Sequence, residues 1–304
     1  MENNLKNKIL KLKKEKEALI LAHYYQRPEI QDIADAVGDS YYLSKVAKDC
    51  DENIIVFCGV KFMAESAKIL SPEKTVLLPT FDAGCPMADM ADPNDVLALK
   101  KKHPNAKVVC YINSSTEVKA VSDVCCTSSN AVNIINNLDA DEIIFLPDKN
   151  LGEYVQQQVK NKKIILWSGF CITHKKVSAE EIIKAKKLHP DIKVLVHPEC
   201  EKPVRDLADF LGSTGQIIDF VNNSDNKKFL ISTEEGVLHQ IKLKNPDKEF
   251  YVPSGGMVCV NMKKTNLNSV YESLLNMEYA IEIDEDIRKK AYRALINMHE
   301  LGGK

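Results

Sequence analysis

The chain has 304 residues, of which 44% are hydrophobic and 28% are charged, as in a soluble globular protein of two or three domains. Its 41 basic and 43 acidic residues leave a net charge of −2, which excludes the strongly basic surface of many nucleic-acid-binding proteins. The longest apolar runs, such as residues 54–60, have the length of a strand and are too short to span a bilayer.

An amphipathic, lysine-rich helix is predicted within residues 1–18, a segment without the apolar stretch of a secretory signal peptide. The chain contains nine cysteines, an odd number, and they are scattered without the dense framework of a disulfide-rich domain. We therefore expect a cytoplasmic protein with free thiols, possible metal ligands, and no nucleic-acid or membrane partner.

After this helix the chain repeats itself three times. Each repeat opens with a short apolar strand, a polar loop, a helix containing Ala-Asp or Ser-Asp, and a turn of small residues; the repeats start at Leu21, Val109 and Leu195. His23 precedes Tyr111 by 88 residues, and Tyr111 precedes His197 by 86. The same two spacings separate Ser40, Ser128 and Thr214.

The second half of each repeat is a strand, a loop, a helix and a closing strand, and the closing strands read "TVLLP", "IILWS" and "FYVPS". The pattern predicts an α/β protein of three similar three-layer α/β/α domains, with parallel sheets, around a pseudo-threefold axis. The predicted domains are residues 1–88, 89–175 and 176–264. The tail, residues 265–304, is predicted to form a helix, a strand and a helix that pack back on the first domain. Ser178 with Glu181, and Asp92 with Pro93, mark predicted helix starts.

One cysteine of each repeat follows the closing strand in a glycine-containing loop: Cys85, Cys171 and Cys259, 86 and 88 residues apart. Open α/β sheets bind ligands at the carboxyl ends of their strands, so around a pseudo-threefold axis these three thiolates converge. Three thiolates suit a 4Fe–4S cluster with one iron left open as a Lewis acid. Small buried hydrophobic residues are the alternative reading, favoured for the other six cysteines. A zinc site that includes His174 is another alternative, although zinc ligands usually lie closer in sequence.

Two further rings of residues follow from the same repeat. His23, Tyr111 and His197 end the first strands, where they can bond to substrate or transfer protons, and Glu199 follows in the third loop. Ser40, Ser128 and Thr214 precede predicted helices, where a hydroxyl and backbone N–H groups can bind an anion. The alternative is that these hydroxyls merely cap their helices. If these three positions bind anions, the substrates are expected to carry several anionic groups.

The sequence resembles the quinolinate synthase family of NAD biosynthesis over residues 20–264, through "LAHYYQ", "QDIADAVGDS", "FMAES", "GCPMADM", "YINSS", "CTSSNAV", "PDKNLG", "HPEC", "GSTGQ" and "VCVNMKK". The resemblance implies condensation of iminoaspartate with dihydroxyacetone phosphate to quinolinate, with loss of phosphate and water, at a 4Fe–4S cluster. It implies Cys85, Cys171 and Cys259 as ligands. It also implies transient supply of iminoaspartate by another enzyme as a possible partnership.

The resemblance further implies a set of site residues. The catalytic candidates are His23, Tyr25, Tyr111, His197 and Glu199. The substrate-binding candidates are His23, Ser40, Tyr111, Asn113, Ser128, His174, His197, Glu199, Ser213 and Thr214. The chain departs from the family at Tyr24, where asparagine is frequent, and in "CITH", where "CPVH" is familiar. It also lacks any cysteine after Cys259, where some relatives carry a cysteine triplet.

Two other functions stay open at this point. A three-thiolate cluster also suits an aconitase-like hydro-lyase acting on a small hydroxy acid. A binding protein held together by zinc, without turnover, is the alternative from another class. Formation of a pyridine dicarboxylate separates the first from quinolinate synthesis, and analysis for iron and sulfide excludes the second.

Overall fold

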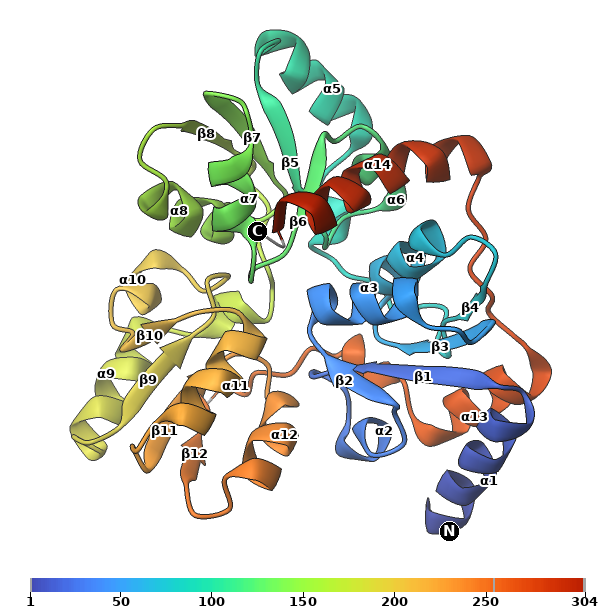
Figure 1. Cartoon of the computed structure of the whole chain (residues 1–304). Coiled ribbons are helices and arrows are strands. Elements are labelled where there is room, and N and C mark those ends of the chain that lie inside the picture. The colour runs from blue at the N-terminus through green and yellow to red at the C-terminus, as the bar shows by residue number, and fades with distance from the viewer. Residues whose placement is uncertain (1, 254, 303–304) are drawn as a thin grey trace.

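The computed structural model describes residues 2–253 and 255–302. Three four-stranded sheets lie around a common centre, and each is parallel throughout (Figure 1). Within each sheet the strands follow the same order, with the second strand of the repeat beside the first, then the third and the fourth. The prediction of three similar α/β units with parallel sheets is therefore confirmed.

The elements of each unit follow in chain order. The first unit contains α1 (Glu2–Glu15), β1 (Ala18–His23), α2 (Pro28–Gln31), β2 (Ala36–Gly38), α3 (Ser40–Asp49), β3 (Ile54–Cys58), α4 (Lys61–Leu70) and β4 (Thr75–Leu77). The second contains α5 (Pro93–Lys102), β5 (Lys107–Tyr111), α6 (Thr116–Ala120), β6 (Val124–Cys126), α7 (Ala131–Asn137), β7 (Glu142–Leu146), α8 (Lys149–Gln158) and β8 (Lys163–Leu166). The third contains α9 (Ala179–Leu188), β9 (Lys193–Val196), α10 (Lys202–Arg205), β10 (Phe210–Leu211), α11 (Thr214–Asn223), β11 (Lys228–Ser232), α12 (Val237–Lys244) and β12 (Glu249–Tyr251). The third closing strand thus ends before Ser254, which lies outside the described residues.

The central strands are buried on both faces, which explains why they read as continuous apolar runs and not as an alternation. The helix starts follow the predicted signals. Ser178 and Glu181 form the capping box of α9, and Asp92 accepts a hydrogen bond from the backbone of Asn94 at the start of α5. These caps set where each helix begins and so where each loop meets the centre.

The buried apolar side chains form four clusters among the described residues, and these clusters are distributed unequally over the three units. One large cluster of buried side chains runs from the first unit into the second, for example from Phe57 to Phe145, and the first unit has a smaller cluster besides. The third unit has two clusters of its own, one on each face of its sheet, represented by Val194 and Phe229. The first two units therefore share a large core, which the third unit joins through Met262 and Cys259 of its cysteine loop.

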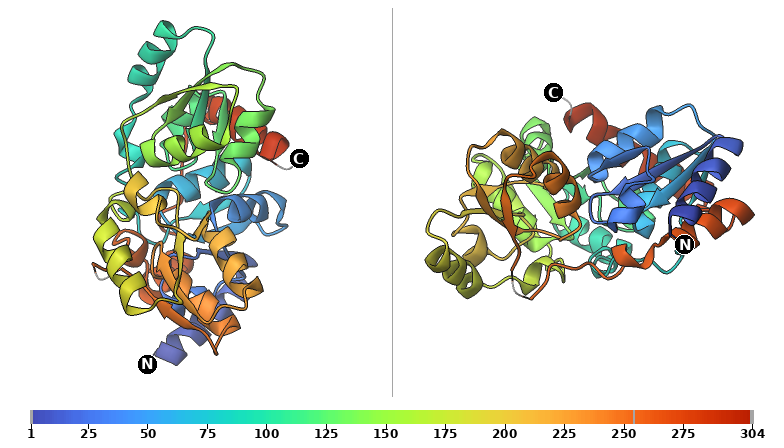
Figure 2. Two further views of the ribbon diagram at one scale, coloured as in Figure 1. Left: turned by 90° about the vertical axis from the view of Figure 1, so that its left-hand side faces the viewer. Right: turned by 90° about the horizontal axis from the view of Figure 1, so that it is seen from below.

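The tail contains α13 (Leu267–Asn276) and α14 (Glu285–Gly302). Helix α13 packs against α1, and between the two tail helices a single antiparallel bridge joins Ala280 to Leu77 in place of the predicted strand. Helix α14 lies across α4 of the first unit and α6, β6 and α7 of the second (Figure 1). Two further views show α1 and the end of α14 on different sides of the molecule (Figure 2). The domain boundaries remain predictions.

None of the helices in the described part of the chain combines the length and the apolar character that crossing a membrane requires.

Candidate active site

Loops from all three units enclose a central cavity of about 110 Å³. It is lined by residues that the sequence analysis singled out: His23, Tyr25, Ser40, Cys85, Tyr111, Asn113, Ser128, Cys171, His174, His197, Glu199, Thr214 and Cys259. Residues as distant in the sequence as His23 and Cys259 therefore meet at one place.

The three cysteines occupy equivalent positions. A short 3₁₀ helix begins three residues after each of them: Ala88–Met90, His174–Lys176 and Met262–Lys264. The first backbone N–H of each helix faces the sulfur of its cysteine and favours the thiolate form. The three loops therefore present their sulfurs in the same way.

Without metal, the three thiols keep their protons. Burial raises the pKa of Cys85 to about 12, and it also raises the pKa values of Cys171 and Cys259. A negative charge on Cys259 would further raise the pKa of Cys85. Three thiolates can therefore coexist here only with a cation that compensates their charge, as a bound metal does.

The spacing of the donor groups tests which metal group fits. Among the described residues, one set of three potential ligands has all its ligand atoms within 4.8 Å of one another, and it is Cys171, His174 and Glu199, not the three cysteines. A tetrahedral zinc ion with Zn–S bonds of about 2.3 Å holds its sulfurs roughly 3.8 Å apart. The three sulfurs do not all lie within 4.8 Å of one another, which is wider than a single zinc ion would hold them. An iron–sulfur cluster fits this donor set, whereas the zinc site considered above does not.

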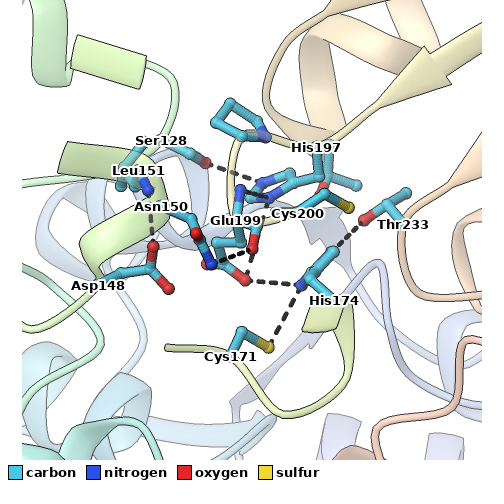
Figure 3. Close-up of polar contacts among 12 residues, drawn as sticks. Ser128, Asp148, Asn150, Leu151, Cys171, His174, His197, Glu199, Cys200 and Thr233 are labelled. Atoms are coloured by element: carbon cyan, nitrogen blue, oxygen red, sulfur yellow. Dashed lines mark hydrogen bonds and ion pairs between the residues drawn. The ribbon is translucent and has the colours of Figure 1, made fainter. Parts of the chain in front are cut away.

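Glu199 is the centre of a buried hydrogen-bond network (Figure 3). Its Oε2 lies 2.7 Å from His174 Nδ1. Its Oε1 accepts a hydrogen bond of 2.6 Å from the hydroxyl of Tyr111. His174 Nδ1 also lies 3.3 Å from Cys171 Sγ, and its Nε2 lies 3.0 Å from the hydroxyl of Thr233. The network joins a potential metal ligand to a carboxylate, a phenol and an imidazole.

The charge states in this network differ from those in water. Burial opposes the charge on Glu199, but His174, His197 and Tyr111 together hold the pKa of its carboxyl well below the usual range. Burial and the Glu199 carboxylate raise the pKa of Tyr111, so its phenol stays protonated. The site therefore contains a carboxylate with a phenol donor bound to it.

His23 and His197 share one geometry. The backbone N–H of Tyr25 donates to His23 Nδ1 at 3.1 Å, and that of Glu199 donates to His197 Nδ1 at 3.3 Å. With Nδ1 as an acceptor, the neutral ring carries its proton on Nε2. Burial lowers the pKa of each histidine to about 3. Both therefore act as neutral donors through Nε2–H near pH 7.

The hydroxyl ring is not made of helix caps. The residues that cap α3, α7 and α11 are Asp39, Asn130 and Ser213, one or two positions away from Ser40, Ser128 and Thr214. The hydroxyl of Thr214 lies 2.7 Å from that of Tyr25, and that of Ser128 lies 3.3 Å from His197 Nε2. The capping alternative is thereby removed for these three residues.

Two other predicted residues differ in their placement. Ser213 is buried beside the cavity but not in its lining, and its side chain accepts a hydrogen bond from the backbone of Gln216. Asn113 lines the cavity, and its Oδ1 is buried with no hydrogen-bond partner among the described residues. That oxygen is available for a donor group of a substrate.

The sequence analysis missed several residues of the site, among them Asp39, Glu234 and Thr233. Asp39 and Glu234 line the cavity, and the hydroxyl of Thr233 lies 2.7 Å from that of Tyr25. Glu234 stands 86 residues after Asp148, the spacing of the repeat, so comparison of equivalent positions would have found it. Nothing in the sequence marks Thr233.

Comparison with known proteins gives a consistent result. The family model described as quinolinate synthetase A protein matches residues 7–300. Proteins named quinolinate synthase from Clostridium perfringens (strain 13 / Type A) and Clostridioides difficile (strain 630) are 68% and 56% identical over 300 and 301 residues, which is 99% of this chain in both cases and 100% and 99% of the relatives. The protein of the same name from Caldicellulosiruptor bescii is 61% identical over 298 residues, 98% of each chain.

Proposed function

Since the chain belongs to the quinolinate synthetase A family and is thus an enzyme of NAD biosynthesis, we propose that it condenses iminoaspartate with dihydroxyacetone phosphate. The products are quinolinate, phosphate and water. The observation that carries the proposal is one cavity that contains three equivalent cysteines, a buried carboxylate network and three hydroxyls at helix starts. A pyridine dicarboxylate formed from two anionic substrates needs each of these parts.

Cys85, Cys171 and Cys259 would hold a 4Fe–4S cluster. When bound, the cluster supplies a Lewis acid through the iron that carries no cysteine, and a Lewis acid assists the loss of a substrate hydroxyl. The loops present the three sulfurs in the same way, so the protein contributes an equal ligand from each unit.

The anionic groups of the substrates are bound by the hydroxyl ring. Iminoaspartate has two carboxylates and the triose has one phosphate. Ser40 and Thr214 are the first residues of α3 and α11, where free N–H groups and the positive end of the helix dipole favour anions. Ser128 stands at the approach to α7 and, with the Nε2–H of His197, donates to the same region.

Proton movement is assigned to Glu199 and its partners. Glu199 can take a proton from a substrate carbon or nitrogen, while Tyr111 keeps its own proton and donates to Glu199 Oε1 at 2.6 Å, and His174 Nδ1 lies 2.7 Å from Oε2. His23 contributes the second Nε2–H donor, and it orients a substrate oxygen without charge. Tyr25, whose hydroxyl bonds to Thr214, covers the anion site from the first unit.

An anaerobic assay of the reconstituted protein tests the proposal. Iminoaspartate generated in the assay and dihydroxyacetone phosphate should yield quinolinate, detected by mass, with one phosphate released per turnover. The Cys85→Ser variant serves as the matched control and should yield none. Water addition to an unsaturated acid without any quinolinate would replace the proposal by the hydro-lyase. Absence of iron after reconstitution would remove the cluster from it.

A further inference from the structure

Each cysteine loop is fastened to the loop that follows the third strand of its own unit. In each unit a backbone N–H of that loop donates a hydrogen bond of 2.8 Å to the carbonyl oxygen of the residue two positions before the cysteine. The three bonds run from Lys61 to Ala83, from Lys149 to Gly169, and from Glu235 to Met257. The residues just before these donors are therefore equivalent, and they are Val60, Asp148 and Glu234. Two of the three are carboxylates with 0% of their surface exposed. Buried carboxylates need a structural reason.

Glu234 connects the third unit to the first. Its Oε1 accepts a hydrogen bond of 3.1 Å from the backbone N–H of Cys259, and its Oε2 accepts one of 2.7 Å from that of Gly236. Its charge is balanced by Lys263, whose Nζ lies 3.1 Å away. The same ammonium donates to the backbone carbonyl of Tyr25 at 2.7 Å. One ion pair thus holds both the Cys259 loop and the Tyr25 loop.

Asp148 and Asn150 connect the second unit to the third in the same direction around the axis. Asp148 Oδ1 accepts a hydrogen bond of 2.6 Å from the backbone of Leu151, and its Oδ2 is buried with no hydrogen-bond partner among the described residues. The backbone of Asp148 forms a parallel bridge with Gly169, two residues before Cys171. The side-chain amide of Asn150 donates to the backbone carbonyl of Glu199 at 3.1 Å (Figure 3). A cysteine loop and the next unit's substrate loop are again held from one short segment.

The two junctions are equivalent although their residues differ. Glu199 lies two residues after His197, as Tyr25 lies two residues after His23. Gly236 is the counterpart of Asn150, 86 residues later, and a Cβ at Gly236 would lie 2.8 Å from Lys263 Nζ. The ammonium therefore fills the space that the Asn150 side chain fills in the other junction. Between the first and second units the equivalent positions are apolar, Val60 and Phe62.

We propose that Glu234 with Lys263, and Asp148 with Asn150, are two sets of positioning residues, each of which fixes one cysteine loop of its own unit and one substrate loop of the next unit. The roles of the loops rest on the proposed function, but the coupling between them does not. The two sets keep a cysteine at a constant distance from the residues that act on the substrate. In the part of the chain that the structure describes, the equivalent positions beside the Cys85 loop hold the apolar Val60 and Phe62 in place of such a set.

Hydrogen exchange of the full chain, measured by mass spectrometry with and without the cluster, tests this coupling. In Glu234→Gln the ion pair is lost, and exchange should accelerate by about tenfold or more in the Cys259 and Tyr25 loops. The Cys171 and Glu199 loops should stay within about twofold of the unchanged protein. Asp148→Asn should give the reverse pattern, so each variant is the matched control of the other. General destabilisation would accelerate all four loops alike and would overturn the proposal.

A second variant separates the two halves of one junction. Lys263→Gln leaves the bonds from Glu234 to Cys259 and Gly236 in place but removes the ammonium that holds Tyr25. Exchange should therefore accelerate in the Tyr25 loop more than in the Cys259 loop. Equal protection of the Tyr25 loop in Lys263→Gln and in the unchanged protein would refute the junction. Exchange needs neither substrate nor turnover, so a failure to form quinolinate would leave this test unaffected.

Discussion

The lining of the central cavity contains two sets of equivalent positions, and the three units carry the same residue in one set but different residues in the other. At the cysteine end the three units contribute the same residue, followed by the same 3₁₀ helix. At the other end, the equivalent positions two residues after the first-strand rings hold Tyr25, Asn113 and Glu199. A cluster with three like ligands needs like donors, whereas a substrate with unlike groups needs unlike partners. The repeat is complete at the cysteines, where the proposed ligand is symmetric, and only partial at the other end, where His23 and His197 share one geometry.

The largest effect is expected at the symmetric end. Cys85→Ser, Cys171→Ser and Cys259→Ser should each abolish iron loading and turnover to the same extent, since serine replaces a soft thiolate poorly. Iron per chain, measured anaerobically beside quinolinate formation, checks this. Cys200→Ala is the control, because Cys200 is fully buried in the core of the third unit and should leave iron unchanged. A near-normal iron content in any one of the three serine variants would show that the three cysteines are not equivalent ligands.

Among the equivalent positions Tyr25, Asn113 and Glu199, we expect a substitution of Glu199 to reduce turnover the most. Glu199→Gln keeps the size and much of the hydrogen bonding but loses the charge, so turnover should fall by about 10²-fold or more with iron content unchanged. Asn113→Ala, at the equivalent position of the second unit, should reduce turnover less because Asn113 transfers no proton. Measuring the turnover numbers of both variants under the same anaerobic conditions checks this prediction. A larger loss in Asn113→Ala would reverse the assignment.

The hydroxyl ring offers adjacent residues with different roles. Thr214→Ala and Ser128→Ala should weaken binding of quinolinate by about ten- to a hundredfold, the cost of one hydrogen bond to a charged group. Ser213→Ala should leave that affinity unchanged and lower the free energy of unfolding by about 1 kcal/mol, because Ser213 caps α11. Calorimetric titration and denaturant unfolding measure the two quantities. Unchanged affinity in both Thr214→Ala and Ser128→Ala would contradict the anion sites.

The smallest effect concerns the two histidines that keep the symmetry at this end. The pKa of His23 and of His197 is about 3 in the folded chain, against 6.5 for free histidine. The unfolded chain therefore binds more protons between these values, and stability falls as the pH falls from 6.5 toward 3. Each histidine contributes a slope of up to about 1.4 kcal/mol per pH unit.

Denaturant unfolding of the cluster-free chain at several pH values measures this slope. His23→Gln and His197→Gln should each flatten it by a similar amount, because the two rings share one geometry. A slope unaltered in both variants would show that the rings are protonated in the folded chain.

The repeat in the sequence predicted the architecture, but it did not reveal every residue of the site. The strands, the helices and the meeting of Cys85 with its two counterparts follow from equal spacing, because equivalent residues of a repeat occupy equivalent places. Asp39 and Thr233 escaped prediction because their roles arise from neighbours in another unit. Asp39 belongs to the first unit, yet its carboxylate lies close to Gly215 of the third.

Two other residues show the limit of one-dimensional patterns. Ser213 and Thr214 are adjacent and chemically alike, but the turn of the chain directs one into its own helix and the other into the cavity. The predicted strand of the tail became a single bridge at Ala280, since Met277 and Tyr279 both take the left-handed conformation and interrupt an extended run.

The unequal sharing of the hydrophobic cores has a consequence for access to the cavity. The first two units adhere through a common apolar interior, with α14 laid across both, whereas the described contacts of the third unit include polar ones such as His239 with Asp32 at 2.8 Å and Gln240 with Gln31 at 3.0 Å. Polar contacts exchange readily with water, but exposed apolar area costs about 25 cal/mol per Å². We therefore expect the third unit to move away from the other two at a lower cost than would separate those two from each other, and substrates to enter along its faces.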